Sequence, residues 1–471
     1  ALAILPLALL ALDSAIAKPG WASWLRAAVV LPLVPLASWQ GLPVAIVAVV
    51  LFVSASPLRQ RWWKGAILTI AAWMLAAPWF VPSTLFTIWE NSRNGPQYYH
   101  FGFLEFVLMA ALLAAAVYAC LWFRRSRRVA LAFALPLAAF AATLWLVFGY
   151  TGYALFPQPH RWAGVAEWAM ALVGGMAVGK AVRRMPKPGH AGISVALLLI
   201  CAAAAIPGYW FLSETLVPGD PATRLEYRAA RWLTGNMPDA RVMASGSTSL
   251  WLNAFSPNPQ VGTAFEYGTI NWQNRIARQT VLTGEHLGYE DAPISTVWLK
   301  AFGARAVVAG GPVSQAAEFG FRSGRKFDGV LPRLWSDGED VIYGVPASDS
   351  LVHVLTTNSA ISQYSEDGLD TSLIERYLVA VEDGSRPNIV ARWLDSNHVL
   401  VTGMMRSDQL LSVQMSWHRG WNATVRGHNA PIQPDGLGQM LVRPRCDGAC
   451  AVMIWYDGGA EMGTAYIVRY I

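Results

Sequence analysis

The stretch LEFVLMAALLAAAVYACLWF (104–123), the basic cluster RRSRR (124–128) and the run VALAFALPLAAFAATLWLVFGY (129–150) decide the fold of this chain. Each apolar run suffices to cross a bilayer as a helix, which needs about 20 residues. Lys and Arg next to the ends of membrane spans stay on the cytoplasmic side. The stretch therefore predicts two membrane-spanning helices joined by a cytoplasmic loop.

The same alternation continues through residues 1–212. Two more basic clusters separate apolar runs, namely Arg59/Arg61/Lys64 and Arg183/Arg184/Lys187. The loops expected on the opposite side carry one basic residue each, Arg93 and Arg161. This asymmetry sets the orientation of the bundle and places 213–471 outside the cytoplasm. The candidate spans are 1–17, 27–54, 65–82, 104–123, 129–150, 163–182 and 192–212.

The run 27–54 is too long for one straight span and contains Pro32, Pro35 and Pro43. Proline removes a backbone donor and bends a helix, so this run is either one kinked span or two half-helices. We therefore predict a multi-pass α-helical membrane bundle with six to eight crossings over 1–212. Because the chain begins at Ala1 without an initiator Met, we expect it to be truncated at the N-terminus, the alternative being a cleaved signal peptide.

Charge is distributed unevenly between the two halves. Residues 1–212 hold 15 Lys and Arg against 4 Asp and Glu, whereas 213–471 hold 21 against 26. The basic character of the whole chain therefore belongs to the membrane loops and not to a basic surface on the soluble part. This distribution excludes a nucleic-acid partner, which would need a clustered basic patch.

Residues 213–350 show strand–helix alternation, which is typical of a small α/β domain. An amphipathic helix is predicted over 222–233 and a second one over 297–302. Short apolar strands are predicted at 241–246, 304–310 and 341–345. Ser245-Gly246-Ser247 follows the first strand but matches neither phosphate-loop consensus, so nucleotide binding is not expected.

Residues 351–471 show a different sequence pattern from 213–350. Short apolar or alternating runs are separated by turn residues at even intervals, which predicts an antiparallel β-sandwich, with one helix possible at 371–381. The aromatic residues of these runs either stack on sugars or belong to the sandwich core. They are Trp417, Trp421, Trp455 and Tyr456.

Cys446 and Cys450 flank Asp447-Gly448-Ala449 in the part of the chain expected outside the cytoplasm. A turn between strands could bring the two thiols together, and an oxidising compartment would permit a disulfide. The alternative is two free thiols. A metal site is not predicted here, because no second pair of ligands stands nearby.

Two predicted outer loops supply the candidate site residues. Arg161 and His160 open a span at the level where a lipid phosphate lies, and arginine forks onto phosphate oxygens. The alternative is an arginine that merely snorkels to headgroups. The other loop, 89–100, has an unusual set of polar and aromatic residues, and the alternative is an ordinary polar loop. Its candidate ligands are Glu90, Arg93, Tyr98 and His100.

Two motifs resemble one family type. FPQPHR (156–161), at the start of a span, resembles the proline–arginine element of bacterial multi-pass YfhO-like proteins. WHRGWNATVRG (417–427), followed by Ala430-Pro431-Ile432 and GLGQMLV (436–442), resembles their C-terminal sandwich. The order of helices, a small α/β piece and a sandwich also resembles membrane glycosyltransferases of the GT-C type.

The resemblance implies a glycosyltransferase in the bacterial cytoplasmic membrane. Such an enzyme would transfer a sugar from a polyprenyl-phosphate donor to a glycan, lipid or protein acceptor of the cell envelope, on the periplasmic or extracellular side. An acidic outer loop that serves the family as base or metal ligand should precede Ala1, so a divalent metal is implied only if that loop carries carboxylates. The alternatives are a non-catalytic polysaccharide assembly or transport protein with a sugar-binding sandwich, and a broken-helix transporter.

Overall fold

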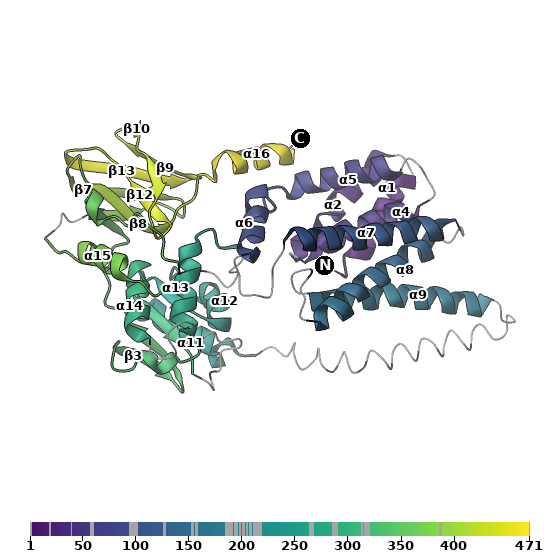
Figure 1. Ribbon diagram of the computed structural model, residues 1–471, viewed down its shortest axis with the longest axis horizontal. Coiled ribbons are helices and arrows are strands. Elements are labelled where there is room, and N and C mark those ends of the chain that lie inside the picture. The colour runs from purple at the N-terminus through teal and green to yellow at the C-terminus, as the bar shows by residue number, and fades with distance from the viewer. Residues whose placement is uncertain are drawn as a thin grey trace. The chain divides into compact units, whose positions relative to one another are not determined.

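The structure is a computed structural model, and it divides into two compact units. The first comprises Ala1–Val217 with Thr464–Ile471, and the second comprises Pro218–Gly463. Figure 1 shows the elements of both units in chain order. The described residues run from 2 to 470 except 18–19, 39, 57–60, 94–101, 126–128, 152–154, 156–158, 184–191, most of 193–218, 263–267, 285–290, 312–313, 315–320, 367 and 386–388.

The first unit is helical. Its apolar residues form one core to which nearly every helix contributes, including Leu12, Leu51, Phe140 and Val165. The helices are α1 (Leu5–Ala17), α2 (Trp21–Val30), α3 (Leu33–Ala37), α4 (Gly41–Ala55), α5 (Arg61–Ala76), α6 (Pro82–Arg93), α7 (Phe103–Arg124), α8 (Val129–Ala142), the π-helical turn η1 (Thr143–Phe148), the 3-10 turn η2 (Pro159–Trp162) and α9 (Ala163–Arg183).

Three helical segments are long and apolar enough to cross a membrane: Phe103–Arg124, Ala130–Phe148 and Pro159–Val182. On α7 large apolar side chains such as Phe106 and Tyr118 point away from the protein, as they would toward lipid. The unit is therefore suited to a membrane. The prediction of a multi-pass bundle is confirmed to the extent of these three spans, and the run 192–212 lies mostly outside the described residues.

The run 27–54 is not one straight helix. It contains the end of α2, the short α3 and most of α4. The breaks fall beside Pro32 and before Pro43, where proline lacks the N–H that helix continuation requires. In the same unit Asp13 pairs with Arg61 at 3.0 Å, so this acidic residue near the end of α1 is neutralised by the first basic cluster.

The second unit begins with a four-stranded mixed sheet in the order β1-β2-β4-β3. Only β1 and β2 are parallel, with Met243 opposite Val307. Helices cover both faces, which makes three layers. Leu233 and Leu252 pack on one face, and Trp298 and Tyr377 on the other. The strands are β1 (Val242–Ala244), β2 (Ala306–Ala309), β3 (Arg333–Asp337) and β4 (Asp340–Gly344).

The helices of this layer extend beyond the two predicted ones. α11 and α12 cover one face, and α13, α14 and α15 cover the other (Figure 1). Their bounds are α11 (Leu225–Asn236), α12 (Gly246–Phe255), α13 (Trp272–Thr283), α14 (Ala292–Ala301) and α15 (Ser372–Val381), with 3-10 turns η3 (Pro221–Thr223), η5 (Gly324–Phe327) and η6 (Thr357–Ser359).

Two antiparallel sheets follow, as the sequence predicts. Their orders are β10-β9-β13-β7-β6 and β11-β12-β8-β5, and residues of both sheets share one core, among them Val401, Val413 and Ile454. The strands are β5 (Val352–Leu355), β6 (Ile389–Trp393), β7 (His398–Met405), β8 (Leu410–Ser416), β9 (Trp421–Val425), β10 (His428–Asn429), β11 (Ile432–Pro434), β12 (Gln439–Val442) and β13 (Gly448–Tyr456).

Two details at the end of the chain refine the sequence prediction. Cys446 and Cys450 form a disulfide with their Cα atoms 6.1 Å apart, and Cys450 lies within β13. The last residues are not part of the sandwich, because α16 (Gly459–Tyr470) follows β13. Gly458 and Gly459 both adopt positive φ, which turns the chain out of the strand and lets the helix begin.

A buried polar seam joins the sandwich to the α/β layer within the second unit. Asn271, which caps α13, donates from Nδ2 to the carbonyl of Leu437 at 2.9 Å. Gln439 donates to the carbonyl of Ala301 at 2.9 Å, and Gln414 donates to the same carbonyl at 3.1 Å. Gly438 has a φ of +66°, and a Cβ there would collide with Asn271, so only glycine fits this approach.

Asp435 stabilises the turn that makes these contacts. Its titration leads to a pH-dependent prediction. Its Oδ1 accepts the backbone N–H groups of Leu437 at 2.9 Å and Gln439 at 2.8 Å. Burial raises the pKa of this carboxyl from 3.8 to about 7. The folded protein therefore binds a proton that the unfolded chain has released, and Asp435 makes folding progressively less favourable as pH rises from about 4 to 7.

We expect Asp435→Asn to raise the thermal unfolding midpoint relative to the parent, by an amount that grows between pH 5 and pH 7.5. Asparagine keeps an oxygen acceptor for both N–H groups but cannot ionise. Differential scanning fluorimetry of the purified protein measures this difference. Asp370→Asn is the control, because the pKa of the exposed Asp370 is lowered and its difference should stay flat. A flat difference for Asp435→Asn would contradict the prediction.

Candidate functional site

His160 and Arg161 lie in the 3-10 turn η2, directly before α9. Both side chains are exposed, whereas their neighbours Pro159 and Trp162 are buried. Burial of the two flanking residues of this short turn leaves the two central side chains facing outward. The sequence therefore presents an imidazole and a guanidinium next to each other at the start of a segment that can span a membrane.

The turn is held by aromatic packing. The Trp162 ring lies edge-on to Phe140 of α8, with ring centroids 5.5 Å apart. One turn later Val165, Ala166 and Ala169 bury the inner face of α9 in the same core. These contacts make the backbone that carries His160 and Arg161 part of the rigid helical pair α8–α9 rather than of a free loop.

The chemistry of this turn suits an anion. A guanidinium presents a planar fork of donors that matches phosphate oxygens. The first N–H groups of a helix point toward its N-terminal side and add a partial positive charge there. If the segment that begins at Pro159 spans a membrane, these donors lie at the depth of lipid headgroups, where a lower dielectric constant strengthens charge-assisted hydrogen bonds.

The other predicted outer loop is placed only in part. Glu90 is exposed on α6, and the α6 backbone continues to Arg93. Tyr98 and His100 lie outside the described residues. Within the parts of the chain that the structure describes, no hydrogen bond or ion pair joins Glu90 to His160 or Arg161. The combination of the two loops into one site therefore stays a prediction.

The aromatic residues of the sandwich divide between core and surface. Trp417 and Trp421 pack against the sandwich core and are half-buried. The Trp421 and Tyr456 rings are 5.1 Å apart, and the Tyr456 hydroxyl lies 3.2 Å from His418 Nδ1. Burial and the nearby Arg419 lower the pKa of His418. The cluster is thus neutral and aromatic, with polar atoms at its rim.

The turn Ser245-Gly246-Ser247 forms a hydrogen bond with another helix of the protein. Gly246 adopts a φ of +55° at the start of α12, and Ser247 Oγ donates to Glu226 Oε1 at 2.6 Å in a buried position. A carboxylate at this helix end would repel a phosphate. The arrangement agrees with the expectation that this turn does not bind nucleotide phosphates.

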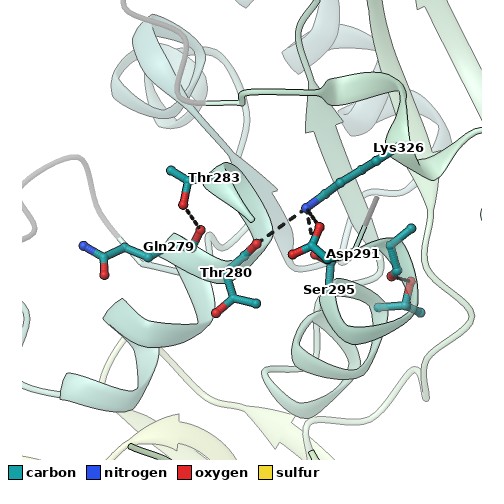
Figure 2. A network of polar contacts seen from close by, with 8 residues as sticks. Gln279, Thr280, Thr283, Asp291, Ser295 and Lys326 are labelled. Atoms are coloured by element: carbon teal, nitrogen blue, oxygen red, sulfur yellow. Dashed lines mark hydrogen bonds and ion pairs between the residues drawn. The ribbon is translucent and has the colours of Figure 1, made fainter. Parts of the chain in front are cut away.

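A buried ion pair that the sequence analysis did not single out lies in the second unit (Figure 2). Lys326 Nζ is 2.5 Å from Asp291 Oδ1 and donates to Ser295 Oγ at 2.8 Å and to the Thr280 carbonyl at 3.5 Å. The two charged side chains are 3% and 1% exposed. Burial lowers the pKa of Lys326, and the Asp291 carboxylate opposes this change.

This network joins η5, α13 and α14. A serine 2.8 Å from a lysine also has the geometry of a nucleophile with its base, but Ser295 is fully buried and Lys326 is bound to a carboxylate. No reacting group can approach a hydroxyl closed off in this way. We therefore assign the network to stability. Single charged residues far apart in sequence leave no periodic signal, so sequence analysis could not pair them.

Elsewhere the described part of the chain holds no group of three or more His, Cys, Asp or Glu side chains placed to bind a metal ion. His160 and Arg161 of η2 are thus the most clearly built candidate site in the described part of the first unit, and their donors suit an anionic ligand rather than a cation.

No protein-family model matches the chain, and no curated protein matches it either. Among solved structures it is similar to a mutant form of the arabinofuranosyltransferase AftD from mycobacteria, with 13% sequence identity, a TM-score of 0.37 and coverage of 97% of this chain and 48% of AftD. A second AftD structure has 13% identity, a TM-score of 0.32 and coverage of 93% and 45%. The chain thus spans about half the length of these neighbours.

The Lys326 network yields a stability prediction. We expect Lys326→Met to lower the free energy of unfolding by about 3–5 kcal/mol, because it leaves the Asp291 carboxylate buried without a counter-charge. The double variant Lys326→Met/Asp291→Leu should recover much of this loss, because neither charge then remains. Denaturant unfolding of the purified protein measures both changes.

Lys300→Met is the matched control. Lys300 pairs with Glu382 at 2.9 Å in a more exposed position, so its loss should cost at most about 1 kcal/mol. Equal losses for Lys300→Met and Lys326→Met would show that burial of the Lys326 pair does not determine its contribution.

Proposed function

We propose that the chain is part of a membrane glycosyltransferase that uses a polyprenyl-phosphate sugar donor on the outer face of the bacterial cytoplasmic membrane. One observation carries the proposal. Arg161 and His160 are held outward, side by side, at the start of a potential span by the burial of Pro159 and Trp162. The resemblance of FPQPHR to the proline–arginine element of YfhO-like proteins supports the same assignment, as does the resemblance of the domain order to GT-C enzymes.

In this mechanism the chain's cations act on the phosphate of the donor. Transfer breaks the bond between the anomeric carbon and the phosphate oxygen, so negative charge grows on the departing phosphate. Arg161 donates two parallel hydrogen bonds to that group, and His160 donates a third when protonated. Because the turn is anchored by Trp162, these donors need no reorganisation as the charge develops.

The acceptor is a glycan, lipid or protein of the cell envelope, and the resemblance assigns its activation to an acidic outer loop of the family. If that loop carries carboxylates, it is also where a divalent metal would bind. Glu90, Arg93, Tyr98 and His100 are proposed to line the same cleft near the lipid phosphate. These parts of the proposal rest on the resemblance.

A second candidate function is a non-catalytic protein of polysaccharide assembly or transport. The cluster of His418, Trp421 and Tyr456 favours it, because aromatic rings with polar atoms at their rim can stack on sugars. In this case polysaccharide binding would be lost in Trp421→Ala and retained in Arg161→Ala. The glycosyltransferase assignment requires instead that binding of the lipid phosphate is lost in Arg161→Ala and retained in Trp421→Ala.

The main test is Arg161→Ala. We expect it to weaken binding of undecaprenyl phosphate roughly 10- to 100-fold, since hydrogen bonds to charged groups contribute about 1.5–3 kcal/mol. The protein encoded by the complete gene is placed in nanodiscs, and capture by a benzophenone derivative of undecaprenyl phosphate is titrated with unmodified lipid. Sugar transfer from a polyprenyl-phosphate donor should fall in parallel.

Arg125→Ala is the matched control for this test. Arg125 is also exposed at the end of a membrane helix, beside Trp122, but it belongs to the predicted cytoplasmic cluster. It should leave capture and transfer unchanged. If Arg161→Ala behaves like Arg125→Ala, then Arg161 only contacts bulk headgroups and the proposed role is wrong.

The disulfide provides a test of sidedness. We expect Cys446 and Cys450 to resist a maleimide polymer in denatured samples from intact cells until a reductant is added, because disulfides persist only in oxidising compartments. Gel mobility measures the number of polymer chains attached. Cys120, which is a free buried cysteine, reports complete denaturation by reacting in both samples. Reaction of Cys446 and Cys450 without reductant would place this half in the cytoplasm.

A further inference from the structure

Helix α12 exposes two large apolar side chains. It buries Ser247, Thr248, Ser249 and Leu252, whereas Leu250 and Trp251 are 59% and 55% exposed. Leu252 packs in the apolar cluster beneath the helix, and Ser247 donates a hydrogen bond to Glu226. Neither Leu250 nor Trp251 is therefore needed to hold the helix on the protein.

The exposed residues continue into an aromatic group. The Trp251 ring is stacked on Phe255, with centroids 6.3 Å apart and an interplanar angle of 16°. Phe255 contacts Tyr227 of α11 edge-on at 5.2 Å. Three rings and one leucine thus lie together on neighbouring helices. Single exposed apolar side chains are ordinary, but a group of this kind marks an interaction surface.

Cations border this group. Arg231 stands four residues after Tyr227 and shares its face of α11, and Arg224 is the residue that directly precedes the helix. Both are exposed, and the described part of the chain shows neither in an ion pair. Aromatic rings edged by arginine are the composition that suits a bilayer interface, where rings enter the headgroup layer and guanidinium groups bind phosphates.

Chain connectivity limits the distance between α11 and the predicted span 192–212. The second unit begins at Pro218, after the candidate span 192–212, and α11 begins at Leu225. The 12 residues between the span and α11 reach at most about 40 Å when fully extended. Helix α12 packs against α11, so both helices belong to the part of the second unit that follows the predicted span in the chain.

We propose that the face formed by Leu250, Trp251, Tyr227, Arg224 and Arg231 rests on the outer leaflet of the membrane and binds phospholipid headgroups. Leu250 and Trp251 enter the interfacial layer, and the two arginines bind lipid phosphates. The surface is distinct from the His160–Arg161 turn and does not depend on the proposed sugar transfer. Its function is to hold the exported unit against the bilayer.

The test uses a nitroxide label on Leu250→Cys in the full chain, with Cys120 and Cys201 replaced by serine and the disulfide retained. The protein is placed in nanodiscs of phosphatidylethanolamine and phosphatidylglycerol. Power saturation compares collision of the label with oxygen, which concentrates in lipid, and with a polar nickel chelate. We expect a several-fold higher oxygen-to-nickel ratio than for a label on Val379→Cys, which is 73% exposed on α15.

Three other results overturn the proposal. Equal ratios at Leu250 and Val379 would place the face in water. Protection of the Leu250 label from both reagents would assign it to a protein partner or a second copy of the chain. Arg231→Glu should lower the oxygen-to-nickel ratio in these nanodiscs, and an unchanged ratio would show that headgroup binding by arginine does not hold the face in place. None of these results bears on transfer activity.

Discussion

Hydrocarbon cannot form hydrogen bonds with a polypeptide backbone, and the first unit depends on this constraint. Any stretch that enters the bilayer must satisfy its own N–H and C=O groups, so the long apolar runs become helices and irregular turns move to their ends. The 3-10 turn η2 stands at such an end, between the helices α8–η1 and α9. The position of His160 and Arg161 is thus a consequence of where the apolar runs stop.

The second unit is subject to a different constraint. Polar groups that are buried in its interior must be paired, and they are paired where its helices and sheets meet. Gln414 and Gln439 converge on the Ala301 carbonyl, and Lys326 meets Asp291 and Ser295. Such groups contribute modestly when paired but are costly when one partner is missing, so they specify one arrangement of helices and sheets more strongly than apolar packing alone.

Sequence analysis succeeded where one physical signal dominated. Hydropathy identified α7, α8 and α9 because lipid imposes the same demand on every residue, and alternation identified the sandwich strands. It missed α13, which buries Gln273, Asn274, Arg275 and Arg278, and α12, which exposes Leu250 and Trp251. Each of these helices buries polar side chains beside its apolar ones, and this mixed burial depends on tertiary partners distant in sequence. The pairing of Lys326 with Asp291 could not be predicted either, because the two residues are far apart in the sequence.

The geometry of η2 also bears on the simplest alternative for Arg161. A snorkelling arginine starts within a span and reaches the headgroups by bending its flexible side chain. Arg161 instead lies in the first turn of the candidate span Pro159–Val182, before α9, and the buried Pro159 and Trp162 stand on either side of the exposed pair. A bulk-lipid contact requires no such support, since any orientation toward the headgroups would serve. A rigid turn becomes useful when the guanidinium must meet one phosphate in one direction, as binding of a single lipid carrier requires.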